Sequence, residues 1–243
     1  NDARRQRQMC IRDSYNMIQY VYGYPVYTFS IEDNSKAINE VQRCIDELKA
    51  VNPSDDWNAE CLKVSSPPTW LGLRRTTNDE KIEFKHIFQE IYKHSKIFLN
   101  KLNMDINLTV NICGDSTCTD NCNDTWINIY EKGHYQGPHW HVIGDEDEEP
   151  EYKGHRQNLF CFTYFMKYDE EKDAKFKFTD RSSGSSPFEE EWKKEVLTFT
   201  RSFIPDVKQG DVIIFPFFMV HEVSKQECDG PRITLSGNLY KEM

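Results

Sequence analysis

The chain has 243 residues, of which 13% are aromatic, and it carries a formal net charge of −10. This length suits one medium-sized domain or a domain with an extension, and it is long enough to bury a large core. The acidic balance argues against nucleic acid as a partner, and no apolar run reaches the roughly 18 residues of a membrane span. No signal-peptide hydrophobic segment is present in this sequence. Because the cysteines are interpreted below mainly as thiols, we expect a cytoplasmic protein.

The first part of the chain is expected to contain one strand and two helices. Residues 26–30 alternate in polarity as a strand does, and residues 36–50 repeat apolar side chains at helical spacing. A longer helix is predicted over residues 78–102. His86 and His94 lie beside lysines on this helix, which favours solvated side chains over metal ligands.

From residue 106 onward the apolar pattern changes to a period of two, which is typical of strands. The segments that show it are residues 106–112, 125–130, 158–168, 195–200, 211–217 and 232–240. Two long polar stretches, 144–156 and 169–192, are expected to be loops. Helices followed by a run of strands predict an α+β fold in which N-terminal helices buttress a sandwich or jelly roll. We expect residues 1–104 and 105–243 to share one core.

The cysteines give little indication of a metal site. Cys44 lies on an apolar helix face and Cys161 in an apolar strand, so both are predicted to be buried thiols. Cys113, Cys118 and Cys122 are spaced five and four residues apart, whereas zinc sites usually show closer pairs. Inert loop thiols are favoured there over a disulfide, and a disulfide over a metal site.

The segment GPHWH contains the first candidate ligands, His139 and His141. Side chains at i and i+2 of a strand point the same way, so both rings project from one face while Trp140 points to the other, toward the core. The third candidate is His221, which follows the apolar run DVIIFPFFMV, where an unbonded histidine is costly to bury. Each histidine alone is best explained as a hydrogen-bonded polar residue, but the three together predict a metal site.

Arg232 is the candidate for binding an acid. It lies on an apolar strand eleven residues after His221, where a lone guanidinium is expensive unless it is paired. Its planar fork suits a carboxylate. Either a structural salt bridge with one of the many acids of the chain or a metal-bound co-substrate with a distal carboxylate would satisfy it.

The segments NIYEKGHYQGPHWH, GDVIIFPFFMVHEV and PRITLSGNLY resemble the Fe(II)/2-oxoglutarate-dependent dioxygenases. More narrowly, they resemble a His-x-His branch that is common in marine bacteria and their phages. The resemblance covers residues 105–243 well and the N-terminal part only loosely. It implies a double-stranded β-helix that uses Fe(II), 2-oxoglutarate and O2, with His139 and His221 as ligands and Arg232 gripping the far carboxylate. Tyr130 matches a tyrosine that often donates to that carboxylate.

Thr234 would assist this grip, and Asn128 would contact the co-substrate or the substrate. The departure from the family pattern is at residue 141, because the common facial triad has a carboxylate where this chain has His141. Three possibilities remain: a three-histidine Fe(II) site, a carboxylate from Asp145 or another acid of the following loop, or a metal site without oxygenase activity. The i and i+2 spacing favours three histidines, since Asp145 lies four residues further on.

The resemblance therefore predicts an oxygenase that hydroxylates a small molecule or a protein side chain and releases succinate and CO2. One rival is a cupin-like three-histidine dioxygenase or isomerase that uses no 2-oxoglutarate. The other is a catalytically inactive barrel used as a binding module. Neither nucleic acid nor a membrane is an expected partner.

Overall fold

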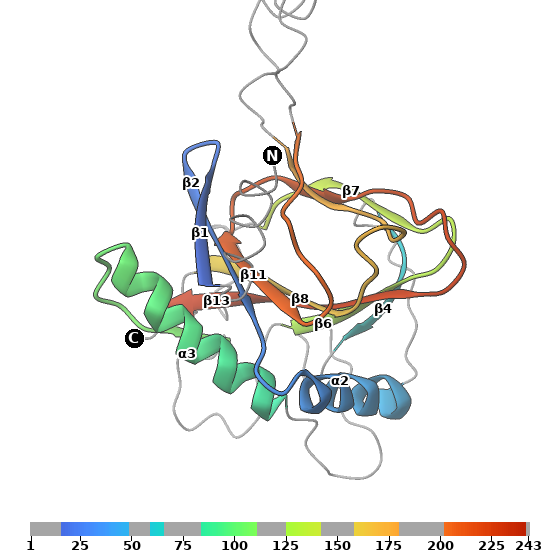
Figure 1. Cartoon of the computed structure of the whole chain (residues 1–243), viewed down its shortest axis with the longest axis horizontal. Helices are drawn as coiled ribbons and strands as arrows, with labels where there is room; N and C mark the ends of the chain where they lie inside the picture. The colour runs from blue at the N-terminus through green and yellow to red at the C-terminus, as the bar shows by residue number, and fades with distance from the viewer. Residues whose placement is uncertain are drawn as a thin grey trace, which may run out of the picture.

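The computed structural model describes residues 16–48, 59–65, 84–110, 125–141, 158–179 and 202–241. Within these ranges the chain forms two antiparallel sheets and two helices (Figure 1). The elements in chain order are β1 (Asn16–Val21), β2 (Tyr24–Ser30), α2 (Asn34–Leu48), β3 (Ala59–Glu60), β4 (Leu62–Ser65), α3 (Lys85–Lys101), β5 (Leu108–Thr109), β6 (Thr125–Tyr130), β7 (Tyr135–His139), β8 (Asn158–Lys167), β9 (Phe176–Thr179), β10 (Ser202–Phe203), β11 (Asp211–Pro216), β12 (His221–Val223) and β13 (Arg232–Lys241).

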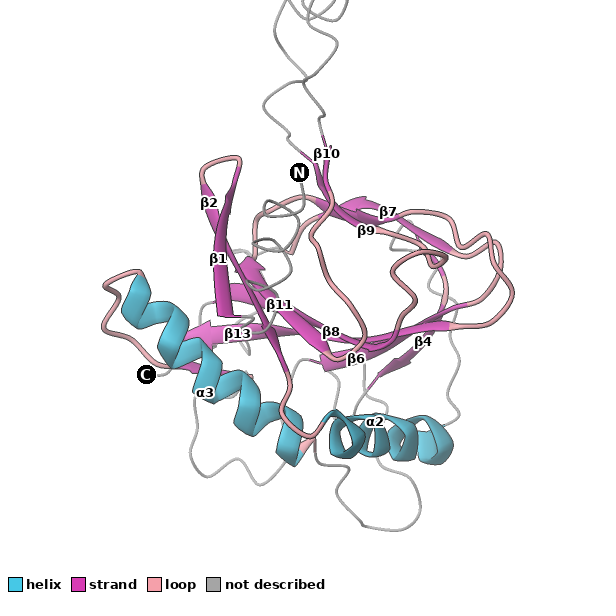
Figure 2. Ribbon diagram, in the orientation of Figure 1, coloured by secondary structure: helices cyan, strands magenta, loops and turns pink. Residues whose placement is uncertain are grey.

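The larger sheet has eight strands, in the order β1-β2-β11-β8-β13-β6-β4 with β5 paired to β13. The smaller sheet has five, in the order β10-β9-β12-β7-β3. The two sheets lie in separate layers, with β7 and β9 facing β6 and β8 (Figure 2). Neighbours in each sheet come from distant parts of the chain, so residues far apart in sequence meet between the layers.

The central strands β8, β11 and β13 of the eight-stranded sheet are buried on both faces, and β13 shows how the sequence achieves this. Ile233, Leu235 and Leu239 pack in the outer core, on the side of the helices. Arg232 and Thr234 alternate with them and line the space between the sheets. Because successive strand residues point to opposite faces, β13 supplies apolar side chains to the core on one face and polar side chains to the space between the sheets on the other.

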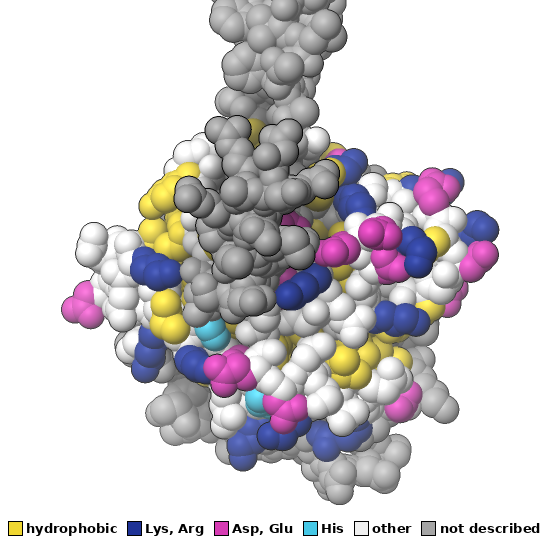
Figure 3. All heavy atoms as spheres, in the orientation of Figure 1, with side chains coloured by type: hydrophobic (Ala, Val, Ile, Leu, Met, Phe, Trp, Pro, Cys, Tyr) yellow, Lys and Arg dark blue, Asp and Glu magenta, His cyan; other side chains and the backbone are white. Residues whose placement is uncertain are grey.

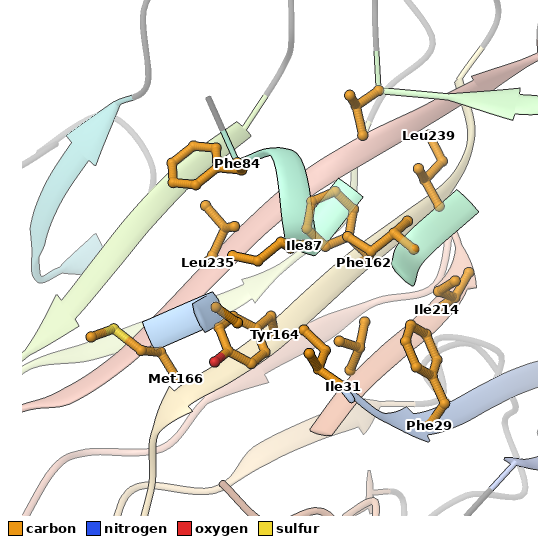
Figure 4. Close-up of a cluster of buried hydrophobic side chains, with 14 of the residues drawn as sticks. Phe29, Ile31, Phe84, Ile87, Phe162, Tyr164, Met166, Ile214, Leu235 and Leu239 are labelled. Atoms are coloured by element: carbon orange, nitrogen blue, oxygen red, sulfur yellow. The ribbon is translucent and has the colours of Figure 1, made fainter. Parts of the chain in front are cut away.

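The outer core joins the two helices to the larger sheet, and Figure 4 shows the part of it around Leu235 and Phe162. The apolar face of α3 places Ile87, Ile91 and Phe98 against the sheet. The ring of Phe98 stacks on Tyr27 of β2, with ring centroids 5.2 Å apart. Side chains of the helices and of the sheet thus belong to one continuous cluster.

A carboxylate of one helix holds the start of the other. Glu40 on α2 accepts hydrogen bonds from the backbone N–H groups of His86 (2.7 Å) and Ile87 (3.1 Å) in the first turn of α3. These N–H groups have no partner within their own helix, and the positive end of the helix dipole favours an anion there. This contact fixes the beginning of α3 relative to α2.

The inner core lies between the sheets and is rich in aromatic rings. Phe176 and Phe178 of β9 pack against Phe215 of β11, with ring centroids 5.7 and 5.1 Å apart. The contact of Phe178 with Phe215 is edge-to-face, an arrangement that stabilises an apolar core beyond simple area burial. Phe176 and Phe215 also line one side of the site described below.

Most predicted elements are present with shifted ends. The helix expected at 36–50 is α2, and that expected at 78–102 is α3, of which residues 78–83 lie outside the described ranges. The strand expected at 106–112 reduces to β5, and that expected at 195–200 lies outside the described ranges. The stretch 169–192, expected to be a loop, contains strand β9.

The expectation for His94 was wrong. It is buried, its ring stacks on Phe29 with centroids 4.0 Å apart, and its Nδ1 lies 3.1 Å from the hydroxyl of Tyr27. Burial in this cluster lowers the pKa of His94 below its ordinary value. Among the described helices, none is long and apolar enough to cross a membrane.

Candidate metal centre

Three histidines meet between the two sheets. His139 ends β7 and His221 begins β12, and these two residues are directly opposite in the antiparallel ladder. His141 follows two residues after the end of β7, where its N–H donates to the carbonyl of Phe217 at 3.0 Å. One candidate ligand atom from each of the three rings lies within 4.8 Å of the others. The structure therefore brings together the three histidines expected from the sequence.

Each ring is held by its Nδ1 atom. His139 Nδ1 lies 3.0 Å from the carbonyl of Gly137, and His221 Nδ1 lies 2.9 Å from the carbonyl of Met219. His141 Nδ1 lies 2.6 Å from Oδ1 of Asn238. Because these oxygens can only accept, each Nδ1 carries a proton, and in the neutral form of each ring Nε2 keeps its lone pair. Three imidazoles with Nε2 atoms oriented in this way are a suitable ligand set for a divalent metal.

The surroundings of His221 favour its neutral form. Burial lowers the pKa of His221 well below its ordinary value, and the nearby His139 and His141 lower it further. Its ring stacks on Phe176, with centroids 5.3 Å apart, and meets Phe215 edge-on at 5.0 Å. An imidazole that is neutral at neutral pH is ready to bind a metal without first losing a proton.

Gln136, on β7, links the metal ligands to the next part of the site. Its Nε2 donates toward Nε2 of His139 at 3.2 Å, and its Oε1 accepts from the hydroxyl of Tyr130 at 2.8 Å. A metal bound to His139 would take the lone pair that this amide now uses, so the amide would have to turn away. Sequence reasoning did not single out Gln136, although it stands in the quoted segment NIYEKGHYQGPHWH.

Arg232 has no exposed surface, and among the described residues no polar atom is hydrogen-bonded to its Nε, Nη1 or Nη2. It is surrounded instead by the rings of Tyr130, Phe165 and Tyr168, whose centroids lie 4.9, 5.5 and 5.6 Å from its Cζ. Burial lowers the pKa of Arg232, while Tyr130, Tyr168 and Asp173 oppose that change. Arginine nevertheless remains charged in proteins. The structural salt bridge considered from the sequence is not formed within the described residues.

One cavity connects Arg232 to the three histidines. Its lining includes the other predicted co-substrate residues, Tyr130, Asn128 and Thr234. The pKa of Tyr130 is raised above its ordinary value, mainly by burial, so its hydroxyl keeps a proton to donate. Of the described residues that line this cavity, none is an aspartate or a glutamate. Asp145, the alternative third ligand, lies outside the described ranges.

The structure also decides which face of β8 points inward. Cys161 and Thr163 line the cavity, whereas Phe160 and Tyr164 pack in the outer core. Cys44 and Cys161 are both buried, as predicted. The cluster of Cys113, Cys118 and Cys122 lies outside the described ranges.

The expectation for Trp140 was wrong, because its side chain is 40% exposed. Strand β7 ends at His139, so the alternation assumed for residues 139–141 does not continue beyond it. The tryptophan at the site is Trp126 of β6, whose ring stacks on His141 with centroids 5.5 Å apart. It is the second residue of the predicted strand 125–130, and no role was predicted for it from the sequence.

The part of the chain that contains this site matches a known family. Residues 124–238 match the family model described as "Putative 2OG-Fe(II) oxygenase", where 2OG stands for 2-oxoglutarate. The matched segment includes the three histidines and Arg232, and the match agrees with the resemblance that the sequence motifs indicated. Proteins of this family use Fe(II), 2-oxoglutarate and O2. A search of curated proteins by sequence found no match.

Solved structures with a similar fold extend over nearly the whole chain. The prolyl-4-hydroxylase of Pseudomonas putida has a TM-score of 0.54 at 8% identity, over 91% of this chain and 95% of that one. SnoK, a non-heme alpha-ketoglutarate-dependent carbocyclase from nogalamycin biosynthesis, has a TM-score of 0.55 at 10% identity, over 92% and 81%. HygX of Streptomyces hygroscopicus, solved with nickel and 2-oxoglutarate, has a TM-score of 0.50 at 9% identity, over 97% and 86%. At such low identity these similarities establish the fold.

Proposed function

We propose that this protein is an Fe(II)- and 2-oxoglutarate-dependent hydroxylase whose two sheets form a double-stranded β-helix, or jelly roll. The observation that carries the proposal is the pairing, within one cavity, of three convergent imidazoles with a buried guanidinium whose nitrogens are hydrogen-bonded to no described residue. The first group suits a divalent metal, and the second suits the carboxylate of an acid bound to it.

The proposed iron ligands are Nε2 of His139, His141 and His221. Their Nδ1 hydrogen bonds hold the rings in the tautomer and orientation that ligation requires. Iron and 2-oxoglutarate, when bound, supply the activation of O2, in which the co-substrate loses CO2 to become succinate and the substrate gains a hydroxyl group. The residues of the chain supply placement and exclusion of water.

Arg232 would bind the distal carboxylate of 2-oxoglutarate through two parallel N–H bonds. Tyr130 lies against the guanidinium and would donate its hydroxyl to the same carboxylate after leaving Gln136. Thr234 is the next residue along β13 on the cavity face, and Asn128 is its register partner on β6. We assign Thr234 to support of the carboxylate and Asn128 to contact with the co-substrate or the substrate.

The same observation ranks the rival functions. A cupin-like three-histidine enzyme that uses no 2-oxoglutarate would leave the buried charge of Arg232 without a partner, at a free-energy cost that folded proteins rarely tolerate. We further propose a small molecule or a protein side chain as the substrate. On the face shown in Figure 3, basic and acidic side chains of described residues are interspersed, which supports this choice over nucleic acid.

The deciding experiment is an anaerobic titration of the protein with Fe(II) and then 2-oxoglutarate. We expect the weak visible absorption of the iron chelate to appear at one equivalent of each. His139→Ala and His221→Ala should fail to retain iron, whereas Arg232→Ala should retain iron and need far more 2-oxoglutarate. Wild-type protein that binds no iron, or binds iron without forming the chelate, would contradict the proposal.

A further inference from the structure

This inference rests on the proposed function. With iron and 2-oxoglutarate bound as proposed, the cavity has an unusual balance of charge. A divalent iron and the Arg232 cation bring three positive charges, and 2-oxoglutarate brings two negative ones. In the common facial triad the carboxylate ligand supplies the remaining negative charge. Here His141 stands in that position, and the described lining of the cavity contains no carboxylate.

Asp173 does not remove this imbalance. It attracts Arg232 electrostatically but does not line the cavity. Its Oδ1 accepts a hydrogen bond from Gln226 at 2.7 Å, and its Oδ2 accepts one from the N–H of Asp169 at 2.7 Å. Among the described residues, one positive charge at the metal is thus left without a negative partner in a buried site, which is energetically expensive.

The side of the cavity that the larger sheet forms offers a binding position for an anion that would balance this charge. Ser236 of β13 is the register partner of Trp126 on β6 and of Thr163 on β8. These three residues therefore lie side by side on neighbouring strands, at one level of the sheet. All three line the cavity, and Trp126 stacks on His141. This level lies four residues beyond Arg232, which is roughly 13 Å along the strand. A five-carbon acid held by Arg232 is too short to reach it.

The two hydroxyls at this level can donate to an anion. Thr163 Oγ1 and Ser236 Oγ lie 3.1 Å apart and share one hydrogen bond. A hydroxyl has a single proton, so the group that accepts this bond keeps its own O–H free to donate elsewhere. A bound oxyanion would take that O–H and, at the same time, compensate the charge of the metal.

We propose that the substrate of this enzyme carries an oxyanion, a carboxylate or a phosphate, which binds beside the metal at Ser236 and Thr163. The anion replaces the charge that the family's carboxylate ligand normally provides. Substrate binding therefore balances the positive charge of the site, and a neutral analogue of the same shape binds poorly.

The test uses full-length protein loaded anaerobically with Fe(II) and 2-oxoglutarate and titrated with acetate or inorganic phosphate at constant ionic strength. The readout is the position of the chelate absorption, supported by calorimetry. We expect both anions to shift the band without abolishing it, and we expect acetamide, a neutral analogue of acetate, to bind at least tenfold more weakly. Equal binding of acetate and acetamide, or no response to any anion, would overturn the inference.

Two variants test whether the anion is bound because of the charge at the metal and because of the hydroxyl of Ser236. His141→Asp restores the family's carboxylate, so it should keep the chelate and bind acetate at least tenfold more weakly than wild type. Ser236→Ala should keep iron and 2-oxoglutarate binding and also weaken acetate, whereas the surface change Phe218→Ala should alter nothing. Unchanged acetate affinity in Ser236→Ala contradicts the assigned location, even where His141→Asp fails to fold.

The outcome also distinguishes this inference from the function on which it rests. Wild-type protein that forms no chelate contradicts the oxygenase proposal itself. Protein that forms the chelate but ignores anions contradicts only the assignment of an anionic substrate. A carboxylate that reached the metal from outside the described ranges, such as Asp145, would produce this second result.

Discussion

Asn238 Oδ1 accepts a 2.6 Å hydrogen bond from Nδ1 of His141, across 97 positions of the chain. The other two candidate ligands donate to backbone carbonyls two residues before them, on their own segments. His141 lies beyond the end of β7, and its Nδ1 partner comes from β13. The orientation of the third ligand therefore involves a distant side chain, which also accepts from Sγ of Cys161 at 3.1 Å.

Replacing Asn238 should weaken metal binding. Asn238→Leu removes the acceptor that fixes the tautomer and orientation of His141, and the loss of such a partner usually lowers metal affinity 10–100-fold. Asn238→Asp keeps an acceptor and should bind metal within a few-fold of wild type. Competition with a chelator, using Co(II) and its visible spectrum, measures the affinity. Ser236→Ala, on the same face of the same strand, is the matched control, and equal affinity in Asn238→Leu and wild type would refute the role of Asn238.

Removing the charge of Arg232 should act in opposite directions on stability and on co-substrate binding. Arg232→Met replaces a buried guanidinium that has no hydrogen-bond partner among the described residues with an apolar side chain of similar length. Without ligands, we expect the free energy of unfolding to rise by about 1–3 kcal/mol, because an uncompensated buried charge is lost.

The same variant should lose the thermal stabilisation that 2-oxoglutarate gives to metal-loaded wild-type protein. Thermal melts with and without 2-oxoglutarate, in the presence of Mn(II), measure both effects. A less stable apo variant would show that a partner for Arg232 exists elsewhere in the chain. Retained stabilisation by 2-oxoglutarate would show that Arg232 does not bind its carboxylate.

The sequence was most informative at positions where a polar or charged residue type is rarely found without a specific partner. A histidine pair at i and i+2, a histidine after an apolar run and an arginine on an apolar strand each carry a large cost unless they are partnered. Their joint presence therefore predicted that they lie in one cavity. The pairing of His139 with His221 between β7 and β12 places two of them side by side there. The helices were also predictable, because an apolar face such as that of α3 repeats with the helical period.

Other features depend on contacts that periodicity does not encode. Both faces of β8 are buried, one under the helices and one against the smaller sheet, so its apolar run gave no indication of which face holds Cys161. Asn238 acquires its role only through a neighbour across the fold, and Gln136 only because a turn brings Tyr130 and His139 to its two ends. Strand β9 was missed within a polar stretch, although the alternation of Phe176 and Phe178 could have indicated it.

The buried His94 should make folding stability depend on pH. Its pKa is lowered by burial, with Glu90 and Glu32 opposing this change and Lys93 adding to it. A histidine with a lowered pKa binds protons more readily when unfolded, so the stability it contributes is complete above its ordinary pKa of about 6.5 and is lost as the pH falls. Wild type should lose more thermal stability between roughly pH 7 and pH 5 than His94→Gln does. Parallel slopes for the two proteins would show that His94 does not titrate in this range.

Shortening Phe98 should test whether the helices and the sheets form one folding unit. Phe98 on α3 is fully buried, stacks on Tyr27 and meets Phe160 of β8 edge-on at 5.4 Å. Phe98→Ala should lower the free energy of unfolding by about 3–5 kcal/mol, since it removes the ring and leaves a cavity. Phe218→Ala, at a position that is 42% exposed, should change it by less than about 1 kcal/mol. Denaturant unfolding followed by circular dichroism and by tryptophan fluorescence should give coincident transitions in Phe98→Ala, whereas a separate early loss of helix would show that α3 unfolds independently of the sheets.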